Sequence, residues 1–514
     1  MSAWSSGYVL DVPYTNGFYR ELSPAFLQFA LLSQSIHPPQ FGPDAAYCEL
    51  GCGQGITTAV MAAANPQMRF WGFDFNPAQI ANARRLVAEA GLSNVTFEDF
   101  SFEQVAGLPD DALPQFDVIA LHGIYSWISP ENRGFIVDII NRRLKPGGIV
   151  YISYNCLPGW ATAAPLQRLI REHANRHPGR SDHQAKAAVD FARQVKEAGT
   201  VYFAANPTLA GRLEKLPEQN QAYLAHEYLN GHWHPMYHLD VARELEAARL
   251  TYVATATLVE SRDNVSVQPA IRKMLEETSD RGWQETLRDF AANRQFRRDL
   301  FMRGANSISA IGLFNVLNGQ SFALVVPRDT VKFEFQGPLG AVTGQETLYK
   351  SVVDALAERP HTVAELKALP VFAGRPASVL VEVLMMLVHG GSIASAPHDP
   401  QGPAAKTARA FNQAIIQRAL NGETINYIAA PAIGSAISVG FTDLLVLHAL
   451  FQTPQVTIEE IVTEGWAMMA RTGQRLLKAG KALQTPEENQ QELAAQIEVT
   501  VRTRLPVWRQ LGVV

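Results

Sequence analysis

Cysteine is scarce in this sequence. Only three cysteines, Cys48, Cys52 and Cys156, occur in 514 residues. An odd number at these spacings fits neither a disulfide framework nor a four-ligand zinc site, which excludes the small disulfide-rich secreted proteins and predicts a reducing, cytoplasmic setting. The N-terminal stretch also lacks the basic start and the continuous apolar run of a secretory signal, so export by that route is not expected.

Long apolar runs and an excess of positive charge are missing too. The most apolar long segment, Tyr427 to Phe441, has 15 residues and contains Pro431, whereas a membrane-spanning helix needs about 20 apolar residues. We expect a buried helix there and no membrane insertion. A net charge of -5 and a pI near 6.2 give no general attraction to phosphate backbones, so nucleic acid is not an expected partner.

The composition and the length indicate a globular protein with several domains. The chain has 47% hydrophobic and 18% charged residues, which is typical of globular proteins and not of disordered or fibrous ones. Its 514 residues exceed what a single hydrophobic core usually organises. We therefore expect more than one domain.

The first half alternates short apolar runs with helical patterns. Runs that are typical of strands precede or follow helical stretches at five places: AAYCEL, RFWGFD, VTFEDF, FDVIALHG and KPGGIVYISYN. Repeated βα units of this kind predict a parallel sheet covered by helices on both faces. The expected fold class is a doubly wound, Rossmann-like α/β domain.

Ligands of such sheets bind beyond the carboxyl ends of the strands, where the strand order reverses. Gly51, Gly53 and Gly55 follow the first strand as GxGxG, and glycines allow positive φ and a close approach of backbone to ligand. Asp74 stands 19 residues after Gly55 at the end of the next strand, where a carboxylate can accept hydrogen bonds from both hydroxyls of a ribose. The third glycine arrives one residue too early for a dinucleotide site. Ordinary turns at strand ends are the alternative explanation.

The motifs ELGCGQG, the strand ending at Asp74, EDF with Asp99, and the KPGG turn resemble, in this order, those of class I S-adenosylmethionine-dependent methyltransferases. The resemblance implies S-adenosylmethionine as cofactor, ribose binding by Asp74 with Phe75 beside it, and adenine recognition by Asp99 and Phe100. The other implied cofactor contacts are Glu49 at the methionine end, the loop Gly51, Cys52, Gly53, Gln54 and Gly55, and His122 after the fourth strand.

A wider resemblance covers nearly the whole chain. PYTNGFYRELSPAFL, LPGW, HEYLNGHWHPMYHLD and FRRDLFMRG resemble a bacterial subgroup that includes protein lysine methyltransferases of an outer-membrane adhesin and carries a C-terminal methyltransferase regulatory domain. The resemblance implies a protein or peptide acceptor whose lysine amine is methylated. A small-molecule N- or O-methyltransferase and a noncatalytic cofactor-binding protein are the alternatives.

Residues after the fourth and fifth strands are the candidates for contact with the acceptor. His122, Tyr125 and Trp127 follow the fourth strand, and Tyr154 and Asn155 leave the fifth at the same edge. A lysine amine with a pKa of about 10.4 must lose its proton before it attacks, and aromatic faces can orient the ammonium first. We predict that these residues form the catalytic wall, with ordinary loop packing as the alternative.

The predicted domains follow from these patterns. Residues 1–44 form an N-terminal lid and helix, in which Tyr14 closes over the cofactor. Residues 45–305 form the methyltransferase domain, whose segment 156–249 is a mainly helical insertion on the substrate side. Strands are expected at LTYVATATL and FRRDLFMR, the second of them antiparallel.

Beyond Gly304 the sequence is mostly helical. Residues 306–400 are predicted to be a winged-helix-like regulatory module, and residues 401–514 a C-terminal helical module. The TVAEL and TIEE segments have the Thr and Glu spacing of capping boxes. We expect the chain after about Ala305 to bind or position the acceptor.

The segment HEYLNGHWHPMYH places four histidines close together, at 226, 232, 234 and 238. No HExxH spacing is present, and methyl transfer needs no metal, so we predict no metal site. The cluster is interpreted as a packed substrate-side surface on which Glu227 and Tyr228 can contact the substrate.

Overall fold

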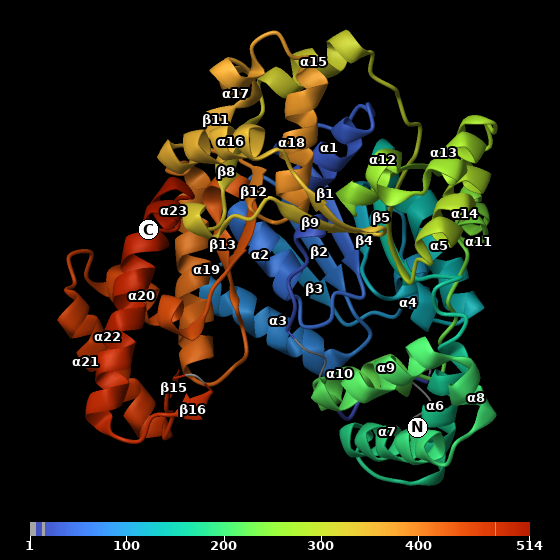
Figure 1. The fold of residues 1–514 in the computed structure, drawn as a ribbon, viewed down its shortest axis with the longest axis horizontal. Helices are drawn as coiled ribbons and strands as arrows, with labels where there is room; N and C mark the ends of the chain where they lie inside the picture. The colour runs from blue at the N-terminus through green and yellow to red at the C-terminus, as the bar shows by residue number, and fades with distance from the viewer. Residues whose placement is uncertain (1–6, 13–15, 479) are drawn as a thin grey trace.

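The computed structural model describes residues 7–12, 16–478 and 480–514. A seven-stranded sheet lies at the centre of the molecule, with helices on both faces and the C-terminal helices, orange to red, along one side (Figure 1). Its strand order is β3-β2-β1-β4-β5-β7-β6. The order reverses between β1 and β4, which is where an open α/β sheet binds its ligand.

The five strands of the βα units lie parallel to one another, as the sequence predicts. β7 runs antiparallel between β5 and β6, so the prediction of a doubly wound α/β sheet with an antiparallel strand is confirmed. The strands are β1 (Ala46–Leu50), β2 (Arg69–Phe73), β3 (Val95–Glu98), β4 (Phe116–Leu121), β5 (Leu144–Asn155), β6 (Thr251–Thr255) and β7 (Phe296–Met302).

Helices cover the two faces of the sheet with separate apolar cores. α1 (Pro24–Ser33), α2 (Ile56–Ala64) and α3 (Pro77–Ala90) lie on one face. α4 (Phe102–Gly107), α5 (Pro130–Arg143) and α11 (His238–Glu246) lie on the other. Pro77 occupies the first turn of α3, as expected, and Asn76 caps it by accepting a hydrogen bond from the Ala78 amide.

The chain between β5 and β7 is mostly helical. Its first helices pack around a small core of their own and lie beside the sheet at the lower right of Figure 1. They are α6 (Ala164–Arg176), α7 (Ser181–Glu197), α8 (Val201–Ala205), α9 (Pro207–Lys215) and α10 (Gln221–Tyr228). After α11 and β6 come α12 (Asp263–Ser266), α13 (Pro269–Glu276) and α14 (Arg281–Ala292).

Residues 306–400 combine helices with a small sheet of order β11-β8-β12. The capping box at Thr362 and Glu365 is present. The elements are α15 (Ala310–Asn318), β8 (Ser321–Leu324), β9 (Glu334–Gly337), β10 (Gly340–Thr343), α16 (Glu346–Glu358), β11 (His361–Thr362), α17 (Val363–Lys367), α18 (Ala377–His389) and β12 (Ile393–Ser395). The central strand of the small sheet, β8, precedes α16. That residues 306–400 form a winged-helix-like module stays a prediction.

The remaining chain adds further helices and two hairpins. The capping box at Thr457 and Glu460 is present as well. The elements are α19 (Pro403–Leu420), β13 (Tyr427–Ala430), β14 (Ser435–Ser438), α20 (Phe441–Gln452), α21 (Ile458–Thr472), β15 (Leu477–Lys478), β16 (Lys481–Ala482), α22 (Pro486–Thr503) and α23 (Leu505–Gln510).

The prediction of a buried helix over Tyr427 to Phe441 is wrong. The segment forms the β13–β14 hairpin instead, with Tyr427 paired to Ser438. Pro431 cannot donate to a helical ladder, and Gly434 has a φ of 57°, so the chain turns between them. Within the described residues no helix has the length and apolar character needed to cross a membrane.

One apolar core joins the catalytic sheet to the C-terminal module. All nine residues of α2 are buried, because α2 packs against the sheet on one side and against α19 on the other. Arg418 of α19 donates to Glu89 of α3 at 2.6 Å, and the Thr407 hydroxyl donates to the Ala63 carbonyl at 2.6 Å. Buried residues on the α1–α3 face of the sheet and buried residues of the C-terminal module therefore form a single cluster.

Candidate functional site

The turn between β1 and α2 needs its glycines. Gly51, Gly53 and Gly55 have φ values of 72°, 55° and 71°, which other residues adopt at a cost. A Cβ atom on Gly55 would also lie 2.7 Å from the Phe97 ring and 2.8 Å from the Ala83 side chain. The glycines therefore set the tight turn and the close packing at the amino end of α2.

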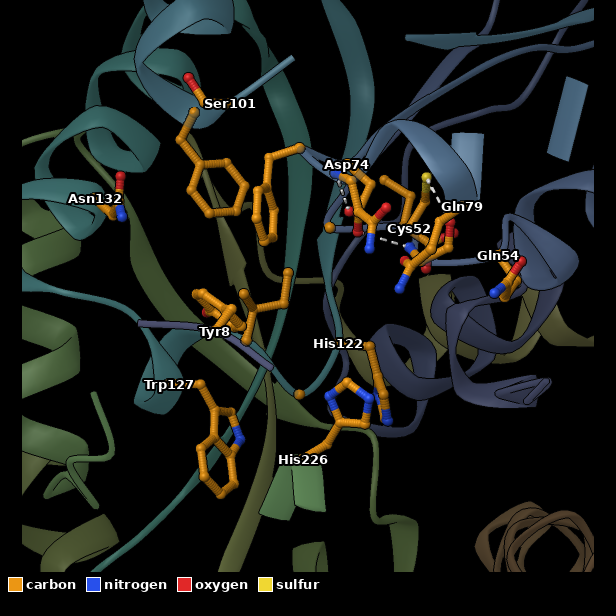
Figure 2. A pocket seen from close by; sticks show the side chains of 18 of the residues that line it. Tyr8, Cys52, Gln54, Asp74, Gln79, Ser101, His122, Trp127, Asn132 and His226 are labelled. Atoms are coloured by element: carbon orange, nitrogen blue, oxygen red, sulfur yellow. Dashed lines mark hydrogen bonds between the residues drawn. The ribbon is translucent and has the colours of Figure 1, made fainter. Parts of the chain in front are cut away.

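A cavity of about 570 Å³ lies beside this loop, at the carboxyl edge of β1, β2 and β4. Its volume is in the range of small-molecule sites. Figure 2 shows side chains from the glycine loop, the end of β2, the start of α4, the end of β4 and α10 around it. The predicted residues in its wall are Glu49, Gly51, Cys52, Gly53, Gln54, Asp74, Phe75, Phe100, His122 and Trp127.

Asp74 lies at the end of β2 and joins two turns. Its carboxylate accepts hydrogen bonds from the backbone amides of Gly53 at 3.0 Å and Asn76 at 2.9 Å. Burial raises the pKa of Asp74 to about 6, although both amide bonds act in the opposite direction. A carboxylate accepts about four hydrogen bonds, so Asp74 keeps acceptor capacity toward the cavity.

Glu49 lies at the end of β1 and faces the same cavity. Its carboxylate accepts a hydrogen bond from the Thr58 hydroxyl of α2. Burial raises the pKa of Glu49 to about 7, and the negative charge of Asp74 adds to the shift. A cation in the cavity would favour the ionised form of both carboxyl groups.

His122 lies at the end of β4 between two tyrosines. Its ring stacks on Tyr19 with centroids 3.6 Å apart, and its Nδ1 atom lies 2.9 Å from the Tyr151 hydroxyl. Burial lowers the pKa of His122 to about 3, and the charge of Arg298 contributes. The imidazole is therefore neutral at physiological pH and adds no positive charge to the cavity.

Helix α10 and the residues after it form a further wall of the cavity, of which the sequence predicted only Glu227. His226, Glu227 and Asn230 line the cavity from this side, and burial raises the pKa of Glu227 to about 7 against the effect of Arg212. Tyr8 and Tyr19 reach the cavity from the N-terminal segment and are not among the predicted contacts. Tyr19 lies within the PYTNGFYRELSPAFL motif, so the wider resemblance was the available signal for it.

Several predicted residues do not reach the cavity. Gly55 turns the chain, and Asp99, with a side chain 43% exposed, lies 3.6 Å from Arg84 and outside the cavity wall. Tyr14 lies outside the described residues. The other three residues that do not line the cavity are Tyr125, Tyr154 and Asn155.

The three residues predicted beside His122 and Trp127 lie away from the cavity wall. The Tyr125 hydroxyl donates to Glu244 at 2.6 Å, and the Tyr154 hydroxyl donates to Asp299 at 2.6 Å. Tyr154 faces away from His122 because side chains alternate along a strand, and its neighbour Ser153 takes the position near the His122 ring. Asn155 is buried, and its backbone N–H donates to the Ser126 hydroxyl.

The charges around the cavity have one sign. Among the described residues that line it, Glu49, Asp74, Glu103 and Glu227 are acidic, and no lysine or arginine is present. Aromatic rings, including Tyr8, complete the wall. Carboxylates and aromatic faces both favour cations, so this cavity suits positively charged ligands.

The histidines of the HEYLNGHWHPMYH segment point to different partners. His226 Nε2 lies 2.9 Å from the Val12 carbonyl, and His238 Nδ1 lies 3.0 Å from Asp299. Over the described ranges of the chain, no three His, Cys, Asp or Glu side chains are grouped so that they could hold a metal ion.

Two family models match the chain. One, described as "Methyltransferase domain", matches residues 48–150. The other, described as "Predicted methyltransferase regulatory domain", matches residues 220–303. This second match lies before residues 306–400, where we expected the regulatory module, and contains α10, β6 and β7.

Known proteins are similar over the whole chain or over part of it. An uncharacterized protein of Synechocystis sp. is 39% identical over 99% of both chains. The trans-aconitate 2-methyltransferase of Methylobacterium nodulans is 29% identical over 27% of this chain and 48% of the relative. The solved structure of PKMT2 from Rickettsia typhi in complex with AdoHcy shares the fold, with a TM-score of 0.71, 19% identity, and coverage of 97% of this chain and 99% of that one.

Proposed function

Because the chain belongs to the class I S-adenosylmethionine-dependent methyltransferases with a methyltransferase regulatory domain, we propose that it methylates a lysine side chain of a protein or peptide. The enzyme class and the cofactor follow from the family. The proposed acceptor rests chiefly on the charge of the cavity, whose wall carries four carboxylates and, among its described residues, no cationic side chain. A lysine ammonium and a sulfonium are both cations, and such a wall attracts both.

The residues present fit the cofactor. The glycine loop brings backbone into the cavity at positive φ, and Asp74 keeps acceptor capacity for the two ribose hydroxyls beside the Gly53 amide. Phe100 supplies an aromatic face at the β3 side for the adenine, and Glu49 supplies a carboxylate at the β1 side for the methionine ammonium. When bound, S-adenosylmethionine supplies a methyl carbon that the amine lone pair attacks as the carbon–sulfur bond breaks, leaving a thioether.

The acceptor wall consists of Glu227, Trp127 and Tyr19 in this proposal. Glu227 attracts the lysine ammonium by its charge and accepts its proton. Burial raises the pKa of the Glu227 carboxyl group to about 7, which makes the carboxylate a better proton acceptor. The aromatic faces of Trp127 and Tyr19 stabilise the cation before deprotonation. The His122 imidazole lies beside Tyr151 and Tyr19. Because it is neutral, it adds no positive charge that would repel the lysine ammonium.

The direct test of the acceptor is intact-mass analysis of proteins from a cell lysate incubated with the enzyme and isotopically labelled S-adenosylmethionine. We expect labelled proteins, with the label on lysine nitrogen after digestion. Label found only in small molecules would contradict the proposal. An anionic acceptor such as trans-aconitate, named by relatives that match part of the chain, would meet four carboxylates and is disfavoured on charge.

Substitution of Glu227 tests the acceptor wall. We expect Glu227→Gln to lower kcat/KM for a lysine-containing acceptor at least about tenfold, because the amide neither attracts the ammonium nor accepts its proton. Cofactor affinity, measured by calorimetry, should stay within about twofold. Glu218→Gln changes an exposed carboxylate of the same insertion and serves as the matched control. Equal loss in both variants, or a loss of cofactor affinity in Glu227→Gln, would remove Glu227 from the acceptor wall.

Substitution of Asp74 tests the cofactor assignment. We expect Asp74→Ala to weaken S-adenosylmethionine binding by about 1 to 3 kcal/mol, because a charged acceptor of buried hydrogen bonds is lost. Calorimetry on the full chain measures the effect, and circular dichroism verifies that the variant folds. Asp111→Ala, an exposed carboxylate away from the cavity wall, is the control. Unchanged affinity in a folded Asp74→Ala protein would show that Asp74 does not hold the ribose.

A further inference from the structure

Gln79 is a polar residue on the buried face of α3. It lies in the first turn of this helix and is only 9% exposed. The other buried residues of α3 are all apolar: Ile80, Ala83, Leu86 and Ala90. A buried glutamine is expected to bond its side-chain amide to a neighbouring group of the fold, because an unpaired buried amide costs free energy.

Gln79 makes no such bond in the described part of the chain. Its backbone N–H donates to the Asn76 carbonyl at 3.1 Å, whereas its side-chain amide has no hydrogen-bond partner among the described residues. This amide offers two N–H donors and one carbonyl acceptor. Bonds within the fold therefore do not account for a polar side chain at this buried position.

Gln79 lines the cavity of about 570 Å³ beside the glycine loop. We call this the first cavity, to distinguish it from a smaller one of about 390 Å³ beside the β13–β14 hairpin. A ligand that enters the first cavity displaces water from its polar groups. Such a ligand is bound tightly only if it replaces the hydrogen bonds that the water made.

The Gln79 amide and the Asp74 carboxylate adjoin the same glycine. A Cβ atom on Gly53 would lie 3.5 Å from Gln79 Oε1, and the Gly53 backbone N–H donates to Asp74 at 3.0 Å. Figure 2 shows Gln79 on the same side of the cavity as Cys52 and Asp74. A ligand group that binds Asp74 is therefore close to the Gln79 amide.

A ribose hydroxyl held by Asp74 can accept a further hydrogen bond. An ionised carboxylate only accepts hydrogen bonds, so the hydroxyl uses its own hydrogen to bind Asp74. The hydroxyl oxygen then still has lone pairs for a donor. Over the described residues no lysine or arginine lines this wall, so a neutral donor is required. The N–H groups of Gln79 are neutral donors that have no partner within the fold.

We propose that Gln79 is a cofactor-binding residue whose side-chain amide donates a hydrogen bond to the ribose hydroxyl held by Asp74. The proposal rests on the cofactor and on the assignment of the ribose to Asp74, and it does not depend on the lysine acceptor. The ribose hydroxyl donates to the carboxylate and accepts from the amide. The site therefore selects a ribose over a deoxyribose.

Calorimetry of S-adenosylhomocysteine binding to the full chain tests the contribution of the amide. We expect Gln79→Met to weaken binding about five- to twentyfold, because the side chain keeps its length but loses its hydrogen bonds. Gln115→Met is the matched control. It changes an exposed glutamine that precedes β4 and lies outside the cavity wall, and its affinity should stay within about twofold of the native value.

A second variant separates the amide from the packing of the side chain. Gln79→Glu keeps the shape of the side chain but has no N–H donor, and it should bind S-adenosylhomocysteine at least as weakly as Gln79→Met. Circular dichroism and thermal melting verify the fold, and Gln79→Glu decides the result if Gln79→Met does not melt cooperatively. Native affinity in a folded Gln79 variant would overturn the proposal.

The ligand side of the hydrogen bond is tested with 2′-deoxy and 3′-deoxy forms of S-adenosylhomocysteine. The native protein should bind at least one of them about tenfold or more weakly than the parent compound. In Gln79→Met this penalty should be at least about threefold smaller, because the amide that the missing hydroxyl would bind is already absent. Equal penalties in the native and Gln79→Met proteins would show that Gln79 does not contact the ribose.

Discussion

A chain that ends at Ala305 is expected to be insoluble or to lack a cooperative unfolding transition. The reason is the core that the two halves share. Helix α2 is buried on all sides, and removal of α19 would expose its outer face together with that of α3. An exposed apolar surface of this extent causes aggregation, and the loss of packing removes a large part of the folding free energy.

The test is expression of residues 1–305 alone and together with residues 306–514 as a separate chain. We expect the first fragment to appear in the insoluble fraction, or to bind a hydrophobic dye without cooperative melting. Co-expression should yield a soluble complex that binds S-adenosylmethionine. A soluble first fragment with cooperative melting and full cofactor affinity would contradict the shared core.

This result also bears on the role of the C-terminal module. The sequence predicts that it binds or positions the acceptor, but the described residues that line the first cavity all lie between Tyr8 and Asn230. Helix α19 of the C-terminal module packs instead against α2 and α3, on the left of Figure 1. Its loss should therefore affect folding before it affects recognition of the acceptor.

Substitution of Arg297 is expected to destabilise the protein by about 3 to 5 kcal/mol, because it removes the one cation that three buried carboxylates share. Arg297 of β7 is only 1% exposed. Its guanidinium lies 2.6 Å from Glu285, 2.5 Å from Asp289 and 2.8 Å from Asp299. Although burial raises the pKa of Asp299, Arg297 and His238 bring it below its ordinary value.

Urea unfolding of Arg297→Met at neutral pH measures this loss. Methionine keeps much of the side-chain volume, so the change reports on charge more than on a cavity. The control is Arg328→Met, which removes an exposed arginine that pairs with Asp354 and should change stability far less. Equal midpoints for Arg297→Met and the unmodified protein would show that the buried carboxylates are protonated and need no cation.

Local sequence signals predicted much of the catalytic fold. The βα units, the first turn of α3 at Pro77 and the capping boxes at Thr362 and Thr457 depend on residues a few positions apart. Their energies come from local backbone preferences and side-chain to backbone bonds. The glycine loop is also a local feature, because its positive φ values arise within the turn itself.

Apart from Glu227, the residues of the first cavity wall that the sequence predicted lie at or just after strand ends. Asp74 and His122 come directly after β2 and β4, so the sheet fixes their position. Tyr125 and Tyr154 are equally close to strand ends but turn to Glu244 and Asp299. Residues far away in the sequence supply those partners, and no local pattern indicates them.

The sequence by itself determined the parallel sheet, the glycine loop and the acidic residue of the cofactor site, because each depends on short-range periodicity or turn geometry. Only the tertiary structure decided that Tyr8 and Tyr19 reach the first cavity and that α2 and α19 share one core. These features depend on contacts between residues far apart in the sequence, whose burial stabilises the fold without leaving a local pattern.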